Sequence, residues 1–145
     1  MQHFKGRVYD VDFGSRQGWC QVLMESTQGT LTARTADECI QTLLLTALVT
    51  RSTGTYIRYY ETSDVKWVSG VRLVGEPGSG GKDKVTAIEL GIDSPVCQIQ
   101  VDGQKILILD PRLLLIVTQA MELPEAGFEY AADGGILYRA KLNQG

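Results

Sequence analysis

The sequence contains little of the chemistry from which most enzyme and metal sites are built. Its 145 residues include a single histidine, His3, and three cysteines without any C-x-x-C spacing. An odd number of cysteines in this arrangement excludes a disulfide framework and a cysteine-based zinc site. Nucleophilic serine or cysteine chemistry normally requires a neighbouring base, and His3 is the one histidine that could supply it. We therefore expect a non-enzymatic protein with no metal and no cofactor.

Long apolar runs are also missing. No stretch approaches the ~18 uninterrupted apolar residues that a membrane helix needs, and the first ten residues, MQHFKGRVYD, lack the apolar region of a signal peptide. These absences predict a soluble cytoplasmic protein with free thiols and no membrane partner. Secretion stays open if a signal segment has been removed.

Positive charge is scarce as well. The net charge is −3, and the two signs are unevenly spread. Residues 1–75 hold 8 Lys and Arg against 7 Asp and Glu, whereas residues 76–145 hold 6 against 10. A dedicated duplex-DNA binder usually carries a basic face. The composition therefore disfavours nucleic acid as a partner.

What the chain does contain is a regular order of strands and helices. In the first part, alternation of apolar and polar residues predicts strands at 5–13, 19–26, 30–34, 55–61 and 66–74. The apolar stripe after residue 35 predicts a helix. Thr35 and Glu38 have the spacing of a capping box, and Gly54 should end this helix near Ser52.

A Gly-, Pro- and Ser-rich segment interrupts this order at residues 76–84, which we interpret as a linker. Its GSGGK string does not satisfy the phosphate-loop pattern. Glu76 stands where the first glycine is required, and Asp83 replaces the hydroxyl residue that would hold magnesium.

After the linker, the same order is predicted again. Strands are expected at 84–92, 96–101 and 104–109, then a helix capped by Asp110 with Pro111 in its first turn. Two more strands close the chain. CQVLM at residue 20 and CQIQV at residue 97 occupy matching places. The fold class predicted is therefore α+β, mainly β, with two tandem βββαββ units of the OB type, residues 1–75 and 85–145, related by internal duplication. The alternative is a chance likeness within one mixed domain.

The segment ECIQTLLLTALVTRSTGTYIRYY, with WVSGVRL after it, resembles the helix–strand–strand unit of the pentameric binding subunits of bacterial A–B-type toxins and related small bacterial proteins. The likeness covers about residues 36–74 and lies in the pattern. It implies an OB-type barrel that binds glycans and assembles through edge strands and helices. The chain departs from that family because it lacks the usual signal and intrachain disulfide and carries a second unit.

Assembly is also expected from the residues themselves. Five apolar residues follow one another at 113–117 and would surround a helix completely, leaving no solvent-facing side. A unit of 60–70 residues is marginal alone. We therefore expect this helix to pack against the other half of the chain or against another chain in a homo-oligomer.

One strand suggests a ligand surface. In TYIRYYE, Tyr56, Arg58 and Tyr60 should face away from Ile57 and Tyr59. Trp67 and Arg72 on the next strand are expected to extend this row. Aromatic and cationic side chains in a row can stack sugars or bases and hold an anion. The alternative is that these residues form part of the barrel wall or of an interface.

The function predicted is a non-catalytic binding or assembly protein, with a glycan or another small polar ligand. Two alternatives remain. One is an enzyme that uses carboxylates such as Asp10 and Asp12, although strand alternation favours a solvated face for both. The other is a single-stranded nucleic-acid binder through the first unit. Cys20 and Cys97 are expected to be buried structural thiols, and Cys39 to pack beside its helix.

Overall fold

The first half of the chain is a closed five-stranded barrel. The computed structural model describes residues 1–75 and 84–145, so nearly all of the predicted linker lies outside the described residues. The barrel strands are β1 (Gln2–Phe13), β2 (Cys20–Ser26), β3 (Gly29–Thr35), β4 (Thr55–Thr62) and β5 (Val65–Val74). β1, β2 and β3 form an antiparallel meander, β4 pairs with both β1 and β5, and a parallel pairing of β3 with β5 closes the ring. This order is compatible with an OB-type barrel.

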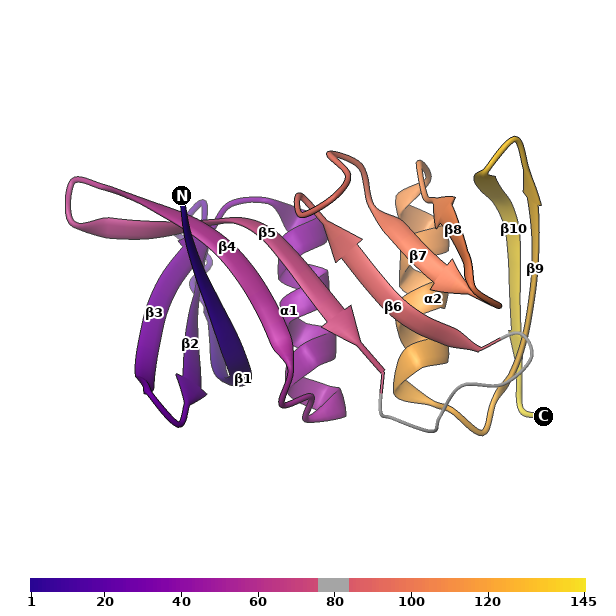
Figure 1. The fold of residues 1–145 in the computed structure, drawn as a ribbon, viewed down its shortest axis with the longest axis horizontal. Coiled ribbons are helices and arrows are strands. Elements are labelled where there is room, and N and C mark those ends of the chain that lie inside the picture. The colour runs from indigo at the N-terminus through magenta and orange to yellow at the C-terminus, as the bar shows by residue number, and fades with distance from the viewer. Residues whose placement is uncertain (76–83) are drawn as a thin grey trace.

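The second half continues the same sheet. Its strands are β6 (Val85–Leu90), β7 (Gln98–Val101), β8 (Gln104–Leu107), β9 (Gly127–Asp133) and β10 (Ile136–Asn143). β6, β7 and β8 form a second antiparallel meander, β8 pairs in parallel with β10, and β10 pairs with β9. β6 also pairs with β5, so one ten-stranded sheet runs through both halves (Figure 1). The described part of the chain is therefore mainly β with two helices, as predicted.

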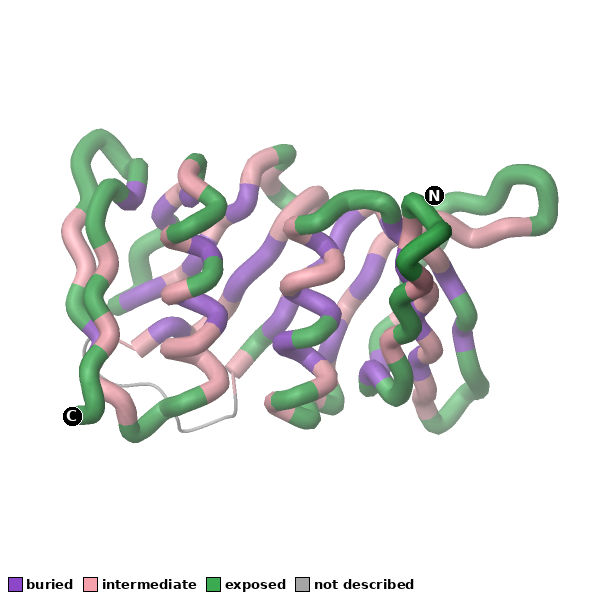
Figure 2. Tube along the Cα trace, turned by 180° about the vertical axis from the view of Figure 1, so that it is seen from behind, coloured by how far each residue is buried: buried purple, intermediate pink, exposed green. Residues whose placement is uncertain are grey.

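Both helices lie on one side of this sheet and bury the same apolar core. Seen from the helix side, buried residues lie on the strands behind the helices, and exposed residues follow the outer sides of both helices (Figure 2). The core is one continuous cluster that draws on both halves. Its largest fully buried side chains include Met24, Leu43, Leu44, Ile57, Leu73, Ile88 and Ile99. Because these aliphatic side chains are removed from water, their burial supplies the main driving force for folding.

The first helix, α1 (Glu38–Thr50), differs from prediction at its start, and it ends near Ser52 as predicted. Asp37, and not Thr35, is its N-cap: the Asp37 carboxylate accepts hydrogen bonds from the backbone N–H groups of Cys39 and Ile40 at 2.8 and 3.0 Å. Thr35 instead ends β3, and its hydroxyl accepts the backbone N–H of Asp37. The helix ends at Arg51, which adopts the left-handed conformation (φ 56°) that a glycine more often takes.

The second helix, α2 (Pro111–Glu122), begins as predicted, with Asp110 as its N-cap and Pro111 in its first turn. Leu114 and Val117 are buried, and α2 packs beside α1. The expectation that residues 113–117 leave no solvent-facing side is wrong, because Leu115 is 59% exposed. The two helices form a single layer on the sheet. The sheet covers one side of each helix, and the opposite side faces solvent. Within the described residues, no helix is long and apolar enough to cross a bilayer.

Candidate functional site

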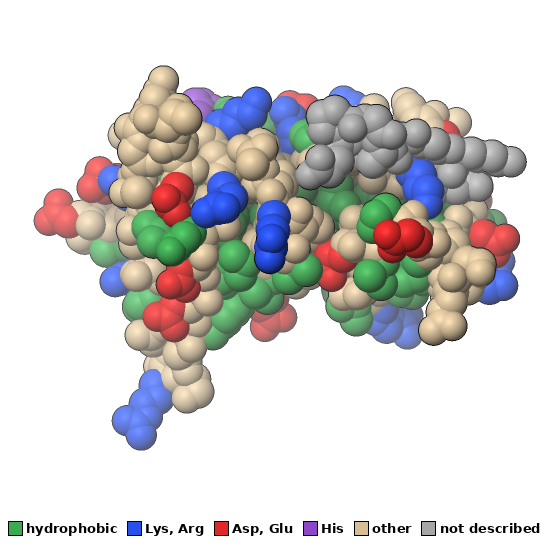
Figure 3. All heavy atoms as spheres, turned by 90° about the horizontal axis from the view of Figure 1, so that it is seen from below, with side chains coloured by type: hydrophobic (Ala, Val, Ile, Leu, Met, Phe, Trp, Pro, Cys, Tyr) green, Lys and Arg blue, Asp and Glu red, His purple; other side chains and the backbone are tan. Residues whose placement is uncertain are grey.

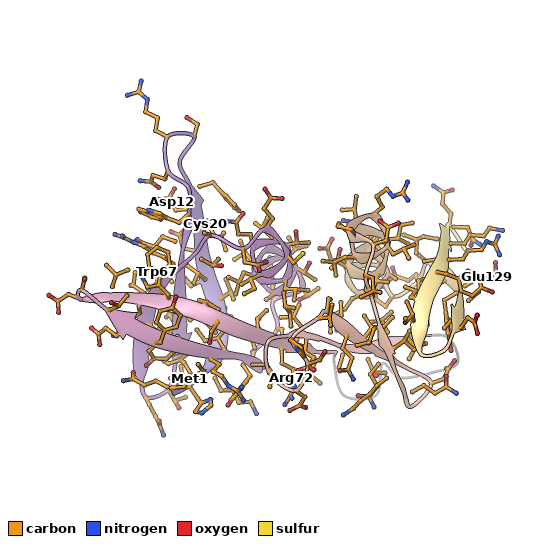
Figure 4. The ribbon with its side chains drawn as sticks, turned by 90° about the horizontal axis from the view of Figure 1, so that it is seen from above. Met1, Asp12, Cys20, Trp67, Arg72 and Glu129 are labelled. Atoms are coloured by element: carbon orange, nitrogen blue, oxygen red, sulfur yellow. The ribbon has the colours of Figure 1, made fainter. Side chains whose placement is uncertain are left out.

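The structure separates the five predicted ligand residues into two groups. Alternation along β4 is as predicted, since Ile57 and Tyr59 are buried. Tyr60 lies directly opposite Trp67 near the hairpin that joins β4 to β5, whereas Tyr56 lies opposite Arg72 further along both strands. Figure 4 shows the consequence: Trp67 lies at the barrel end of the molecule and Arg72 near its middle. Because the two groups lie in different parts of the molecule, they do not form the continuous row that was predicted, and a single compact ligand cannot contact both.

Tyr56 makes its main contacts with the N-terminal strand. Its ring stacks on the imidazole of His3, with 5.5 Å between the ring centroids, and its hydroxyl is hydrogen-bonded to His3 Nδ1. The guanidinium carbon of Arg72 lies 6.0 Å from the ring centroid. Because His3 occupies one face of the ring, Tyr56 offers a ligand less surface than an isolated tyrosine would.

Arg58 contributes to the framework of the fold. Its side chain is half-buried, and its Nη1 atom donates a hydrogen bond to the carbonyl oxygen of Ile92 at 3.2 Å. Its buried Nε atom has no hydrogen-bond partner within the described part of the chain. Arg58 therefore ties β4 to the loop that follows β6.

The barrel end carries two residues that sequence reasoning did not nominate, Trp19 and Arg34. The guanidinium carbon of Arg34 lies 3.9 Å from the centroid of the Trp19 ring, a close cation–π contact. Arg34 also pairs with Trp67 where β3 meets β5. Their neighbours Ala33, Thr35 and Val68 are buried, so alternation places Arg34 and Trp67 on the outer surface of the barrel. We call Trp19, Arg34, Tyr60 and Trp67 the aromatic cluster.

The sequence did contain a pattern that indicates an outward-facing position for Trp19 and Arg34. The segment TLTAR alternates, and its apolar Leu31 and Ala33 place Arg34 on the outer face. Trp19 directly precedes the buried Cys20 and so also faces outward. The sequence did not reveal that β3 and β5 meet, and this pairing is what brings Arg34 to Trp67.

A groove of about 210 Å³ adjoins the aromatic cluster on β3 and the β4–β5 hairpin. Its charged lining is balanced: Arg34 and Lys66 carry positive charge, and Glu61 and Asp64 carry negative charge. Gln21 and Thr32 add uncharged polar groups. The groove is therefore polar without a dominant sign of charge.

The hairpin beside this groove has a strained turn. Ser63 and Asp64 both adopt positive φ, 52° and 62°. Two successive left-handed residues define a type I′ turn, whose twist suits a tight hairpin and which favours Asn or Gly. The turn holds Asp64 in the lining of the groove at a conformational cost of order 1 kcal/mol for each residue.

The residues considered for catalysis do not form a site with the groups around them. Asp10 and Asp12 are exposed on β1, and no group of three His, Cys, Asp or Glu residues within residues 1–75 and 84–145 could hold a metal ion. Cys20 and Cys97 are buried, as predicted, and Cys39 is half-buried. Burial raises the pKa of all three thiols. A raised pKa disfavours the thiolate that nucleophilic chemistry requires.

Comparisons with models of protein families, with curated protein sequences and with solved structures gave no match.

Proposed function

We propose that this protein is a non-catalytic binding protein that recognises a carbohydrate through the aromatic cluster and the groove beside it. The observation that carries the proposal is the stacking of Arg34 on Trp19 next to Trp67, on the outer face of a closed barrel. Aromatic rings offer flat apolar faces, and barrels of this type bind oligosaccharides or oligonucleotides through the equivalent strands and loops.

The charge of the groove favours a sugar over a nucleic acid. Two cations and two carboxylates line it, so a phosphate backbone would meet repulsion as well as attraction. A neutral polyhydroxyl ligand can use all of these groups as hydrogen-bond donors and acceptors. The volume of about 210 Å³ is below the ~300 Å³ of pockets for drug-sized ligands, which suits a single sugar ring at the centre of the contact.

Replacing Trp67 by alanine should weaken carbohydrate binding by at least about tenfold, because a stacking platform contributes roughly 1 kcal/mol or more beyond its buried area. The measurement is a glycan array followed by titration with the best-bound sugar. The chain's two tryptophans, Trp19 and Trp67, both belong to the aromatic cluster. Binding should therefore change the intrinsic fluorescence of the wild-type protein.

Tyr138→Ala is the matched control, because Tyr138 is an exposed aromatic residue of β10 in the other half. It should bind as the wild type does. Carbohydrate binding unchanged in Trp67→Ala would exclude this site. Binding of single-stranded oligonucleotides with a steep salt dependence would favour the nucleic-acid alternative instead.

The proposal includes an internal duplication of the chain. Strands β6 to β10 repeat four of the five pairings found among β1 to β5, including the parallel pairing that follows the meander. The counterpart of the β1–β4 pairing would be β6 with β9, and the edge of β6 is used by β5. An aspartate caps the helix in each half, Asp37 and Asp110. These parallels support descent of the two halves from one βββαββ unit.

Self-association is also part of the proposal. Leu45 and Val49 are exposed one turn apart on α1, and Leu115 is exposed on α2. Figure 3 shows hydrophobic side chains on the underside of the molecule, interspersed with charged ones. Exposed leucine and valine side chains on neighbouring helices are typical of surfaces that meet another protein.

We expect the wild-type protein to sediment as an oligomer, and the double substitution Val49→Lys with Leu115→Lys to shift it to the monomer. Sedimentation velocity over a range of concentrations measures both. Val74→Lys is the control, because Val74 is an exposed valine that belongs to β5 and to neither helix. A wild-type protein that stays monomeric at every concentration would contradict the expectation.

A further inference from the structure

A second groove lies on the opposite side of the sheet from the helices and is independent of the aromatic cluster. It has a volume of about 480 Å³ and follows the outer face of β5, β6, β7 and β8. Its polar lining comes from seven residues: Arg72, Thr86, Glu89, Asp93, Gln98, Gln100 and Lys105. Val74, Ala87 and Ile99 supply apolar surface. This volume lies within the range of about 300–1,000 Å³ that is common for ligand pockets.

One end of this groove is acidic. Glu89 is 7% exposed; its Oε2 atom accepts the backbone N–H of Asp93 at 2.9 Å and lies 3.6 Å from Arg72 Nη2. Asp93 binds the same Arg72 nitrogen at 2.7 Å. Two carboxylates share one guanidinium, so this end keeps a net negative charge. The side chain of Asp93 is 58% exposed and can meet a cation from solution.

The other end is basic. Lys105 lies on β8 and is exposed, and no described carboxylate lies within ion-pair distance of it. Between the two ends, the register places Gln98 beside Glu89 and Gln100 beside both Ala87 and Lys105. The two glutamine side chains present amide donors and acceptors to the middle of the groove.

The distance between the ends sets the size of the ligand. Glu89 on β6 lies two strand spacings of ~4.8 Å from Lys105 on β8, and the register sets the two residues two positions, or ~6.8 Å, apart along the strands, so the acidic end and Lys105 lie roughly 12 Å apart. An extended polypeptide rises ~3.3–3.6 Å per residue, so about four residues span that distance. A chain of this length places its positive amino group and its negative carboxylate at opposite ends, and its backbone amides fall opposite the glutamines.

We propose that this groove binds a short extended peptide of about four residues with free termini. The amino group lies at Asp93 and Glu89, and the terminal carboxylate lies at Lys105. Gln98 and Gln100 hydrogen-bond the peptide backbone, and Val74 and Ala87 accept small apolar side chains. A neutral sugar would neutralise neither Lys105 nor the excess negative charge of the acidic end, and a nucleic acid would be repelled from the acidic end.

The test uses tetra-alanine with free termini, its N-acetylated form and its C-terminal amide, titrated into the full chain by calorimetry. Each cap should weaken binding by about fivefold, the effect of losing an exposed charge pair of ~1 kcal/mol. Lys105→Gln should abolish discrimination against the amide and preserve discrimination against the acetylated peptide. Asp93→Asn should reduce discrimination against the acetylated peptide and preserve discrimination against the amide.

Lys141→Gln is the matched control, because Lys141 is an exposed lysine of β10 that pairs with Glu129 away from the groove. It should bind all three peptides as the wild type does. Trp67→Ala should also leave peptide binding unchanged, which separates this site from the proposed carbohydrate site. Any one of three results overturns the proposal: no binding of tetra-alanine at millimolar concentration, capped peptides that bind as tightly as uncapped tetra-alanine, or unchanged discrimination in Lys105→Gln.

Discussion

Replacing Gly70 by alanine is expected to lower the free energy of unfolding by about 2–4 kcal/mol, because the new methyl group has no space. A Cβ atom at Gly70 would lie 2.4 Å from the carbonyl oxygen of Gly91 and 2.6 Å from its carbonyl carbon. These atoms belong to the backbone of the turn after β6 and cannot rotate away. Gly91 is itself fixed, with φ at 79° and a hydrogen bond from its N–H to the carbonyl of Ser94. The strand β5 and this turn would have to move apart.

Urea-induced unfolding followed by circular dichroism measures the effect. Gly18→Ala is the control, because a Cβ atom at Gly18 meets nothing within 4 Å. It should change the free energy of unfolding by less than about 0.5 kcal/mol. Equal stabilities of the two variants would show that the close approach of β5 to the turn is not needed for the fold. A larger effect at Gly70 would confirm that this contact joins the two halves.

Alkaline pH should destabilise the protein through Cys97. Burial, followed by the nearby Cys39 and Glu89, raises the pKa of the Cys97 thiol to about 12 from an ordinary value of 9.0. Below pH ~9 both the folded and the unfolded thiol keep their proton, so the folded state has its full stability. As the pH rises from ~9 towards ~12, the unfolded chain loses that proton first, and up to about 4 kcal/mol of stability is lost.

Unfolding by urea at several pH values between about 8 and about 11 measures this slope. Other groups also titrate in this range, so the comparison is with Cys97→Ala. That variant should lose less stability over the same interval, although it starts from a lower value because a small cavity replaces the thiol. Parallel curves for the two proteins would contradict a strongly raised pKa. The protected thiol should also react slowly with alkylating agents at neutral pH.

Much of the local structure was predictable because it depends on neighbours in the sequence. Alternation in TYIRYYE placed Ile57 and Tyr59 inside, and Asp110 with Pro111 marked the start of α2. The start of α1 was less predictable. Thr35 and Asp37 are both good capping residues, and the choice between them was decided by β3, which extends through Thr35. The local sequence pattern therefore predicted which segments form strands and helices. The residues at which these elements begin and end also depend on tertiary contacts.

The candidate sites depended on pairings that no local pattern encodes. The parallel contact of β3 with β5 brings Arg34 to Trp67, and the pairing of β5 with β6 brings Arg72 to Glu89. The sequence nominated Trp67 and Arg72 because of their chemistry and placed them on one face. It could not indicate that they serve different surfaces, because that depends on which strand lies beside each residue.

The pairing of β5 with β6 also limits what the second half can become. A β-strand has two hydrogen-bonding edges, and β6 has given one to β7 and the other to β5. β5 occupies four of the six residues of that edge of β6, Ala87–Leu90. Cohesion between the halves therefore takes most of the edge that β9 would need to close a second ring. The continuous outer face on which the larger groove lies exists because this chain uses β6 for cohesion.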